Sequence, residues 1–171
     1  MKKLLLVVLA AAVFSCGDDK KNAKTDMKST PAMEEKAAPE EPMADSNVAV
    51  IVIEGNDQMK YNKSEIRVKA GQTVKLTLKH VGKMKKMVMG HNWVLLQQDA
   101  DIAAVGKAGA IAGANDYIPT DMSDQIIAHT KMLGGGESDT IEFEAPAPGT
   151  YTFMCTFPAH YALMQGTLIV E

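Results

Sequence analysis

The stretch Thr73-Val-Lys-Leu-Thr-Leu-Lys79 alternates polar and apolar side chains without interruption. Because successive side chains of a strand point to opposite faces of a sheet, this pattern predicts a strand with one buried and one solvated face. Ala70-Gly71 precedes it and predicts a turn, and Glu65-Ile-Arg-Val-Lys69 alternates in the same way before that turn. The pattern therefore indicates a β-protein whose sheets each bury one face.

Further short runs extend outward from this stretch, separated by Gly, Pro and Asn. These runs are Val48–Glu54, His91–Gln97, a short segment near Ile126, Asp139–Glu144, Thr150–Cys155 and Thr167–Val170. Many short strands with such turns predict an all-β fold, an antiparallel Greek-key β-sandwich. Residues 99–113 depart from the pattern, because they are rich in Ala and carry Ile102 and Val105 at near-helical spacing. They predict one short appended helix with Asp99 or Asp101 near its N-terminus.

The N-terminus has the features of an export signal. Met1-Lys-Lys is followed by an apolar run that ends near Val13-Phe-Ser-Cys16, which predicts a signal peptide over residues 1–15. The apolar run is too short to span a bilayer. Val13-Phe-Ser-Cys16 is similar to a bacterial lipobox, which implies cleavage before Cys16 and lipid modification of that residue. The alternative is an ordinary signal peptide with a cysteine near its cleavage site, but the polar run Gly17-Asp-Asp-Lys-Lys21 favours the lipoprotein.

Residues 16–47 predict a disordered tether that begins at the lipidated Cys16. The stretch is rich in Lys, Glu, Ala, Pro and Ser and has no aromatic residue, so it cannot bury enough apolar surface to fold. A single folded domain is left over residues 48–171. The formal net charge of the whole chain is −3, which provides no positive field for nucleic acid.

The residues with distinctive chemistry gather near the C-terminus, in Cys155-Thr-Phe-Pro-Ala-His160-Tyr-Ala-Leu-Met164. A second imidazole lies upstream in Met89-Gly-His-Asn-Trp93. Two His, one Cys and a weak axial Met are the ligand set of a blue-copper electron-transfer site. If Cys16 is lipidated, Cys155 is the only other thiol of an exported chain, and it must be buried, paired with another chain or bound to metal. The nearby His160 favours metal.

Three longer stretches resemble the azurins, which are cupredoxins. The stretches are Val88-Met-Gly-His-Asn-Trp-Val-Leu95, His129-Thr-Lys-Met-Leu-Gly-Gly-Gly-Glu137 and Cys155-Thr-Phe-Pro-Ala-His-Tyr-Ala-Leu-Met-Gln-Gly-Thr-Leu168. The resemblance covers residues 48–171. It implies an eight-stranded Greek-key sandwich with an appended helix, one type 1 copper ion, and one-electron transfer between partner proteins of the periplasm.

The resemblance also implies roles for individual residues. His91 and His160 would be the imidazole ligands, Cys155 the thiolate ligand and Met164 the distant axial ligand. The backbone carbonyl of Gly90 would face copper from the opposite side.

Two neighbours of the ligands receive supporting roles from the same resemblance. Asn92 would tie the two ligand segments together, and its backbone N–H would reach the thiolate. Phe157 would shape the ligand loop. His80 matches a family histidine that titrates beside the site, although an inert half-buried side chain is the alternative.

The chain also departs from the family pattern. The domain has no cysteine pair for the disulfide that azurins usually carry. Ala159 stands where Gly is familiar, and most azurins have no tether. None of these departures affects a predicted ligand.

Four protein ligands and a carbonyl leave no open position for a substrate, so the chain is not expected to be an enzyme. Electrons are expected to pass through the exposed edge of His160. An apolar patch for brief docking would surround it, formed by Phe157, Ala159, Ala162 and Leu163. Lys83, Lys85 and Lys86 either steer an acidic partner or form a solvated charge run.

These observations and the resemblance lead to the hypothesis of a membrane-tethered, single-electron carrier. It is expected to be a monomer that docks transiently with redox proteins, held by its lipid in the cell envelope of a Gram-negative-type bacterium, on the periplasmic side. The alternatives are a copper-binding module for delivery or resistance, and a structural lipoprotein without metal. Copper storage would need repeated Met clusters, and Met84-x-x-Met87-x-Met89 is the only one in the sequence.

Overall fold

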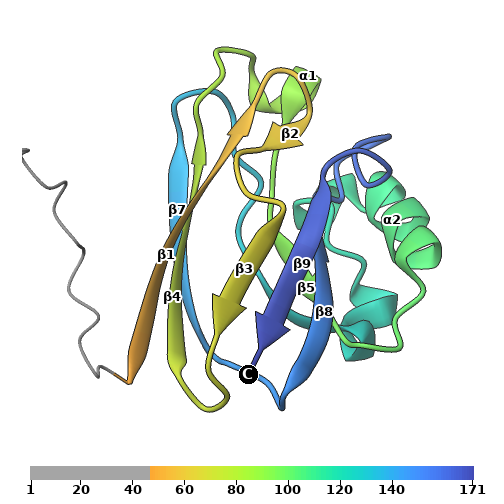
Figure 1. Cartoon of the computed structure of the whole chain (residues 1–171). Coiled ribbons are helices and arrows are strands. Elements are labelled where there is room, and N and C mark those ends of the chain that lie inside the picture. The colour runs from red at the N-terminus through yellow and green to blue at the C-terminus, as the bar shows by residue number, and fades with distance from the viewer. Residues whose placement is uncertain (1–46) are drawn as a thin grey trace, which may run out of the picture. The chain divides into compact units, whose positions relative to one another are not determined.

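The computed structural model describes residues 47–171. The predicted signal peptide, Cys16 and the predicted tether up to residue 46 lie outside the described residues. Two β-sheets pack face to face, and a helical segment lies against one side of the sandwich (Figure 1). The predicted all-β sandwich with a short appended helix is confirmed.

The first sheet has the strand order β2-β1-β4-β7. Its strands are β1 (Val48–Asn56), β2 (Lys60–Tyr61), β4 (Thr73–His80) and β7 (Ser138–Glu144). The second sheet has the order β3-β9-β8-β5-β6. Its strands are β3 (Glu65–Val68), β5 (Val94–Leu96), β6 (Ile126–His129), β8 (Gly149–Met154) and β9 (Gln165–Val170).

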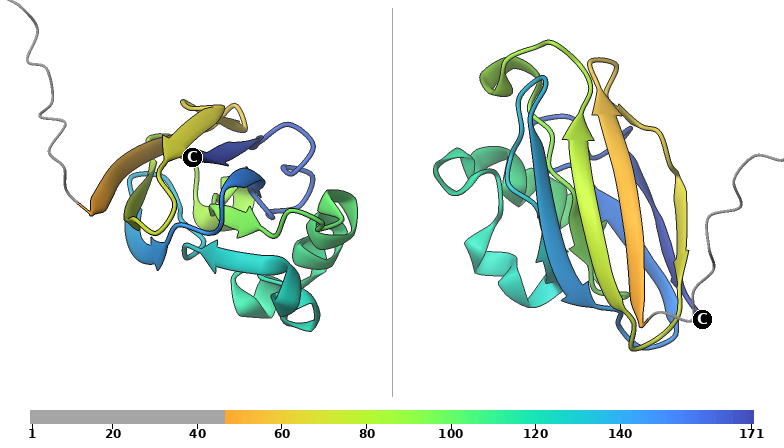
Figure 2. Two further views of the ribbon diagram at one scale, coloured as in Figure 1. Left: turned by 60° about the horizontal axis from the view of Figure 1, so that its bottom comes forward. Right: turned by 90° about the vertical axis from the view of Figure 1, so that its left-hand side faces the viewer.

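Both sheets are mixed, whereas the sequence patterns predicted antiparallel pairing. β1 runs parallel to β4, and β3 runs parallel to β9. The reason lies in the connections, because the chain enters the second sheet as β3 before it returns to the first sheet as β4. In the right-hand view of Figure 2 the first sheet faces the viewer, and in the left-hand view the bottom of the sandwich in Figure 1 comes forward.

The helix predicted within residues 99–113 is α2 (Ile102–Ile111). Asp101 is its N-cap, and the Asp101 side chain accepts a hydrogen bond from the backbone N–H of Ala104 at 2.9 Å, as preferred for this position. Three short helices were not predicted: the single turn α1 (Lys86–Met89), η1 (Gly113–Asn115) and η2 (Thr120–Gln125). They are too short to carry a periodic signal.

The predicted strand His91–Gln97 is shorter in the structure. Regular pairing begins only at Val94, while His91 forms an isolated bridge with Leu133. His91 therefore lies just outside the regular sheet, where its side chain need not follow the alternation of a strand. Within residues 47–171, no helix is long and apolar enough to cross a membrane.

The main core lies between the sheets and is formed by alternate residues of their strands. It contains Ile53, Ile66, Val68, Val74, Leu76, Leu78, Trp93, Leu95, Leu133, Ala145, Tyr151, Phe153, Leu168 and Val170. A separate small cluster of Met132, Cys155, Phe157 and Met164 lies at one end of the sandwich. Three of its four members carry sulfur, so this end of the molecule differs chemically from the main core.

Candidate metal centre

Pairing between β5 and β8 brings the two ligand segments together. Val94 of β5 is the register partner of Met154 of β8. His91 precedes β5 by a short segment, and Cys155 follows β8 directly. Because the two strands are antiparallel, the start of one and the end of the other meet at the same end of the sheet.

Three predicted ligands converge with their donor atoms. One donor atom from each of His91, Cys155 and His160 lies within 4.8 Å of the other two. Cys155 Sγ is 3.5 Å from His160 Nδ1 and 4.0 Å from His91 Nδ1. All three residues are buried. Two nitrogens and one sulfur around a common point fit the trigonal ligand set of a blue-copper ion.

Met164 joins this group through the backbone of the loop between β8 and β9. Its carbonyl accepts a hydrogen bond from the backbone N–H of Cys155 at 2.9 Å, and its own N–H donates to the carbonyl of His160 at 2.8 Å. Its side chain is fully buried in the same cluster as Cys155. A Cβ atom at Gly55 would lie 2.8 Å from Met164 Cε and 2.9 Å from His91 Cδ2, so a side chain there would displace two predicted ligands.

Gly90 brings backbone rather than a side chain to the site. Its carbonyl oxygen lies 3.8 Å from Cys155 Sγ. A Cβ at Gly90 would lie 2.6 Å from the Lys86 carbonyl, 2.8 Å from Met132 Sδ and 2.9 Å from Phe157 Cδ2. Glycine is therefore required here for space, because its φ of −71° is open to any residue.

A hydrogen bond fixes which nitrogen of the His91 imidazole faces the thiol. His91 Nε2 lies 2.8 Å from the carbonyl oxygen of Asn56, so this nitrogen carries the proton and donates. His91 Nδ1 is then the unprotonated nitrogen that faces Cys155. A carbonyl partner of this kind orients a metal-binding imidazole.

Burial holds all three converging groups in their neutral forms. Burial raises the pKa of the Cys155 thiol to about 12, and backbone N–H groups of Asn92 and Phe157 oppose this rise. Burial lowers the pKa of His160 to about 4, with smaller contributions from His91 and His80. Burial is also the main cause of the lowered pKa of His91. A bound cation would displace the thiol proton, and the two N–H groups would stabilise the thiolate.

Asn92 connects the two ligand segments, as the resemblance implied. Its Oδ1 accepts from the backbone N–H of Thr156 at 2.9 Å, and its Nδ2 donates to Thr156 Oγ1 at 2.7 Å. Thr156 Oγ1 donates in turn to the carbonyl of Tyr117 at 2.7 Å. Asn92 and Thr156 are fully buried, so these bonds have no competition from bulk water.

Phe157 is buried beside the site, with its ring centroid 4.7 Å from that of His160 and 5.0 Å from that of Tyr117. Its predicted contribution to an exposed docking patch was wrong, because the ring turns inward. Ala159, Ala162 and Leu163 are exposed as expected, together with Pro158.

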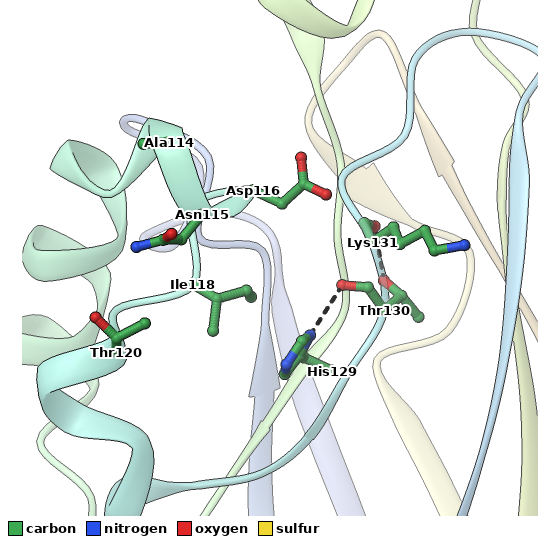
Figure 3. Close-up of a pocket in the computed structure, with 8 residues that line it drawn as sticks. All are labelled: Ala114, Asn115, Asp116, Ile118, Thr120, His129, Thr130 and Lys131. Carbon is green, nitrogen blue, oxygen red and sulfur yellow. Dashed lines mark hydrogen bonds between the residues drawn. The ribbon is translucent and has the colours of Figure 1, made fainter.

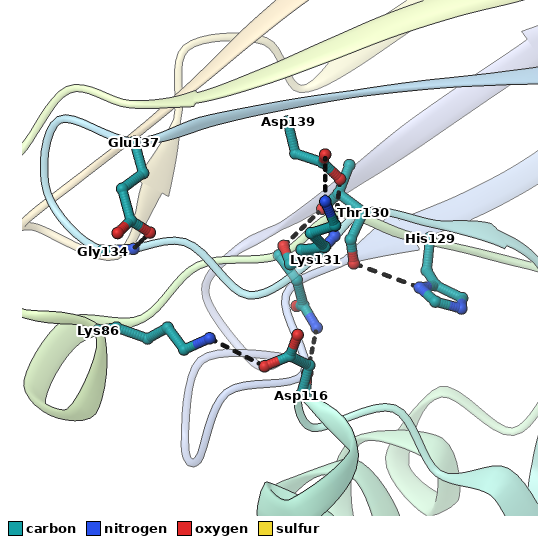
Figure 4. A network of polar contacts seen from close by, with 9 residues as sticks. Lys86, Asp116, His129, Thr130, Lys131, Gly134, Glu137 and Asp139 are labelled. Carbon is teal, nitrogen blue, oxygen red and sulfur yellow. Dashed lines mark hydrogen bonds and ion pairs between the residues drawn. The ribbon is translucent and has the colours of Figure 1, made fainter.

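A third segment supports the ligands and was not predicted. Asp116 and Tyr117 follow η1 with positive φ values of 53° and 62°. Their carbonyls face Asn92 and Thr156. Asp116 Oδ1 also lies 3.0 Å from Lys86 Nζ, which joins this turn to α1 (Figure 4). The signal was weak, because only the Asn115-Asp116 pair suggested a turn.

Helix α2 packs closely against the ligand loop through two glycines. A Cβ at Gly106 would collide with the ring of Tyr161, and one at Gly109 would lie 2.7 Å from Thr156 Cβ. Tyr161 follows His160, and Thr156 follows Cys155, so the helix contacts the residues that follow these two ligands. Gly106 and Gly109 lack the side chains that would prevent this close approach.

His80 stacks on His91 with ring centroids 4.3 Å apart. Its Nδ1 accepts from the backbone N–H of Gly82 at 3.1 Å, and its Nε2 lies 2.7 Å from the Met89 carbonyl. These contacts fit the tautomer in which Nε2 carries a proton and Nδ1 accepts. The stacking places His80 directly against a ligand.

The three lysines of the predicted charge run have different surroundings in the structure. Lys86 is engaged with Asp116, whereas Lys83 and Lys85 are exposed. On the other side of the Asp116 turn lies an open cleft whose lining includes Asn115, His129 and Thr130 (Figure 3). His129 received no role from the sequence, and its imidazole lies at this cleft rather than at the ligands.

Comparisons with known proteins agree with this geometry. Residues 48–171 match the family of copper binding proteins described as plastocyanin/azurin. Azurin of Bordetella pertussis is 47% identical over 120 residues, covering 68% of this chain and 79% of the relative. Azurin-2 of Alcaligenes xylosoxydans xylosoxydans is 48% identical over 121 residues, covering 68% of this chain and 92% of the relative.

Solved structures of similar proteins have the same cupredoxin-like sandwich. Dithionite-reduced auracyanin from Roseiflexus castenholzii has 43% identity and a TM-score of 0.64, over 71% of this chain and 96% of that one. Auracyanin A from Chloroflexus aurantiacus, described as a "blue" copper protein, has 38% identity and a TM-score of 0.66, over 72% of this chain and 99% of that one.

Proposed function

The chain belongs to the plastocyanin/azurin family of copper-binding proteins, and we propose that it works as a lipid-anchored electron carrier of the bacterial cell envelope. His91, Cys155, His160 and Met164 form its type 1 copper site. The protein is a type 1 copper electron carrier and not an enzyme. What we propose is its location in the cell envelope, the residue through which electrons enter and leave, and the kind of redox partner that it contacts.

The observation that carries the proposed mechanism is the burial of the whole ligand set. His91, Cys155 and Met164 have no exposed surface, and His160 is 2% exposed. No substrate can reach the donor atoms through this packing, whereas an electron needs no open position. Bound copper supplies a couple between Cu(I) and Cu(II), which its mixed sulfur and imidazole ligands can both accept.

His160 is the proposed electron port. Its Nδ1 lies 3.5 Å from Cys155 Sγ. The residue is 2% exposed, so a small part of it lies at the surface, whereas His91, Cys155 and Met164 have no exposed surface. The imidazole thus connects the buried site to the outside.

The surface around the port is apolar and suits brief docking. Pro158, Ala159 and Ala162 are exposed next to His160 in the sequence, and Leu163 is 68% exposed. Apolar patches of this kind mark interaction sites. Lys83 and Lys85 are also exposed, and their positive charge supports a partner with an acidic surface.

The course of β1 supports a tethered arrangement. The described chain enters the domain at the start of β1, and Asn56 at the other end of this strand holds His91. A strand of this length, 9 residues, spans about 26 Å at roughly 3.3 Å per residue. An anchor attached before Val48 would therefore join the domain at the end opposite the copper site (Figure 1), leaving the port open to redox partners.

Anchoring itself is proposed from the sequence of residues 1–16. Replacing Cys16 with Ala should move the copper protein from the membrane fraction to the soluble periplasmic fraction without changing its visible spectrum. If the wild-type protein is already soluble in cells, with an unmodified Cys16 by mass spectrometry, the lipid anchor is wrong.

Copper reconstitution tests the carrier function. The Cu(II) protein should show an intense thiolate-to-copper band in the visible region that disappears in Cys155→Ser. The ion should stay bound in the presence of a competing chelator while electrons exchange rapidly between oxidised and reduced protein. A site that readily gives up copper and exchanges electrons slowly would support a delivery or resistance module instead.

Steering by the lysines is tested separately. Lys83→Glu/Lys85→Glu should slow electron exchange with an acidic redox protein at low salt, and the difference should disappear at high salt. Lys107→Glu, an exposed change on α2, is the control. If the rate of electron exchange of the wild-type protein does not change with ionic strength, electrostatic steering by the lysines is excluded.

A further inference from the structure

One peptide plane next to the copper ligands is held at both ends by residues that belong to neither ligand segment. The Tyr61 hydroxyl donates a hydrogen bond to the carbonyl of Asn92. The N–H of Trp93, in the same peptide unit, donates to Thr130 Oγ1 at 2.9 Å. Tyr61 belongs to β2, and Thr130 follows β6, so the two sheets each contribute one restraint.

Three of the four residues that form these contacts are fully buried, and Tyr61 is half-buried. Asn92, Trp93 and Thr130 have no exposed surface. Burial raises the pKa of Tyr61 well above its ordinary value, with a smaller contribution from Cys155, so its hydroxyl remains a proton donor. Loss of either donor or acceptor would leave a buried polar group without a partner, which is costly.

Rotation of this peptide would alter both connections that Asn92 makes to the thiolate side of the site. The Asn92 side chain holds Thr156 through two hydrogen bonds, and Thr156 follows Cys155 directly. The backbone N–H of Asn92 donates toward Cys155 itself. His91, a ligand, immediately precedes Asn92, and the peptide held by Tyr61 and Thr130 fixes the Asn92 backbone on its other side.

We propose that Tyr61 is a positioning residue of the copper centre, and that its hydroxyl acts with Thr130 to orient Asn92 and thereby its hydrogen bonds to Cys155 and Thr156. The inference rests on the copper site of the proposed function but is independent of the lipid anchor and of any partner. The Tyr61 ring packs against both the main core and the sulfur-rich cluster. It meets Phe153 edge to face at 5.6 Å between centroids.

The proposal gives the hydroxyl a role separate from that of the ring. Tyr61→Phe keeps the ring in the core and removes only the donor to Asn92. Loosening of Asn92 weakens N–H donation to the thiolate sulfur. Since such donation favours the reduced site by withdrawing charge from sulfur, the reduction potential should fall.

Tyr151 provides a matched control. Its hydroxyl also donates to a backbone carbonyl, that of Ala147, at 2.7 Å, and its side chain is buried. Tyr151 lies near the start of β8, while Cys155 follows the other end of that strand. Tyr151→Phe therefore loses the same kind of hydrogen bond away from the copper site.

The experiment compares full-length wild type, Tyr61→Phe and Tyr151→Phe in three measurements. In the copper-free proteins, the amides of Trp93 and Thr156 should exchange with deuterium about tenfold faster in Tyr61→Phe alone. In the Cu(II) proteins, only Tyr61→Phe should shift the thiolate-to-copper band and the copper hyperfine splitting. Only Tyr61→Phe should lower the reduction potential.

If all three properties of Tyr61→Phe equal those of Tyr151→Phe, the proposed role of Tyr61 is wrong. A wild-type protein that lacks the visible band would instead overturn the copper site on which the inference rests. If Tyr61→Phe does not fold, Thr130→Val tests the other end of the peptide, and Thr130→Ser, which retains the hydroxyl, should restore the wild-type spectrum. Thr130→Val with wild-type spectrum and potential would also contradict the proposal.

Discussion

Asn92 and Thr156 hold each other by two hydrogen bonds, of 2.9 Å to Asn92 Oδ1 and 2.7 Å from Asn92 Nδ2. Each residue follows a copper ligand, His91 or Cys155, so this pair joins two segments that lie far apart in the sequence. The distance between the two ligands is therefore set by protein contacts that need no metal.

Asn92→Leu should break both hydrogen bonds between Asn92 and Thr156. The variant leaves the buried Thr156 N–H without its acceptor and removes the hydrogen bond that Thr156 Oγ1 accepts. We expect the free energy of unfolding to fall by about 2–4 kcal/mol, together with a lower reduction potential. Urea unfolding and voltammetry measure the two effects. Thr156→Ser keeps both hydrogen bonds and should behave like the wild type. Equal stability of Asn92→Leu and Thr156→Ser would contradict the stabilising role of these hydrogen bonds.

His160→Gly should open the copper site. The cavity left by the imidazole would connect the site to solvent, because His160 already reaches the surface. Added imidazole is expected to restore the visible spectrum of the Cu(II) variant in a saturable titration. His129→Gly removes an imidazole away from the site and should not respond. A His160→Gly protein that stays closed and exchanges electrons at the wild-type rate would refute the port.

Ala159→Gly should stabilise the fold. Ala159 has a φ of 66°, a left-handed conformation that costs a residue with a Cβ about 1–2 kcal/mol and glycine almost nothing. We expect the free energy of unfolding to rise by about 1 kcal/mol in chemical denaturation. Ala162→Gly, at an exposed position of the same loop without positive φ, should give no gain. If both variants have the same stability, strain at Ala159 is not significant.

Copper-free protein should lose stability as the pH falls from about 6.5 to about 4. Burial lowers the pKa of His160 from its ordinary value of 6.5 to about 4 in the folded protein, and the pKa of His91 is also lowered. The unfolded chain therefore takes up protons in this range before the folded chain does, which favours unfolding. Urea midpoints across this range measure the loss, and His160→Gln should reduce it. If the urea midpoint does not change between these pH values, the folded protein does not hold these imidazoles neutral.

Gly106→Ala should disturb the ligand loop from the side of α2. The new methyl group would meet the ring of Tyr161, so we expect a loss of about 1–3 kcal/mol in unfolding free energy, as for overpacked cores, and a shifted visible spectrum. Gly113→Ala provides the control, because its nearest atoms are 3.6 Å or more from the added Cβ. An unchanged spectrum in Gly106→Ala would show that α2 does not position the loop.

Local patterns were sufficient for most strands. Thr73–Lys79 alternates so regularly that the structure extends it by only one residue, to His80. The sequence predicted Asp99 or Asp101 near the N-terminus of α2, and Asp101 is its N-cap. The parallel pairing of β1 with β4 could not be predicted in this way, because alternation describes which face is buried and not which strand lies beside it.

The ligands could be predicted because their chemistry is rare and their spacing is short. Cys155, His160 and Met164 share one loop, so the sequence itself places them together. The supporting contacts were less accessible. Asn56 and Tyr61 act on the site through a carbonyl and a hydroxyl, and such groups occur throughout any sequence without marking a metal site.

The amino-acid sequence by itself determined the sandwich class, the appended helix and the identity of the copper ligands, since periodicity and donor chemistry are local properties. Only the tertiary structure decided which backbone atoms orient His91, which peptide Tyr61 and Thr130 restrain, and why Gly55, Gly90 and Gly106 have no side chain. These features depend on distances of a few ångströms between segments that are remote in sequence, and such distances arise only when the two sheets pack.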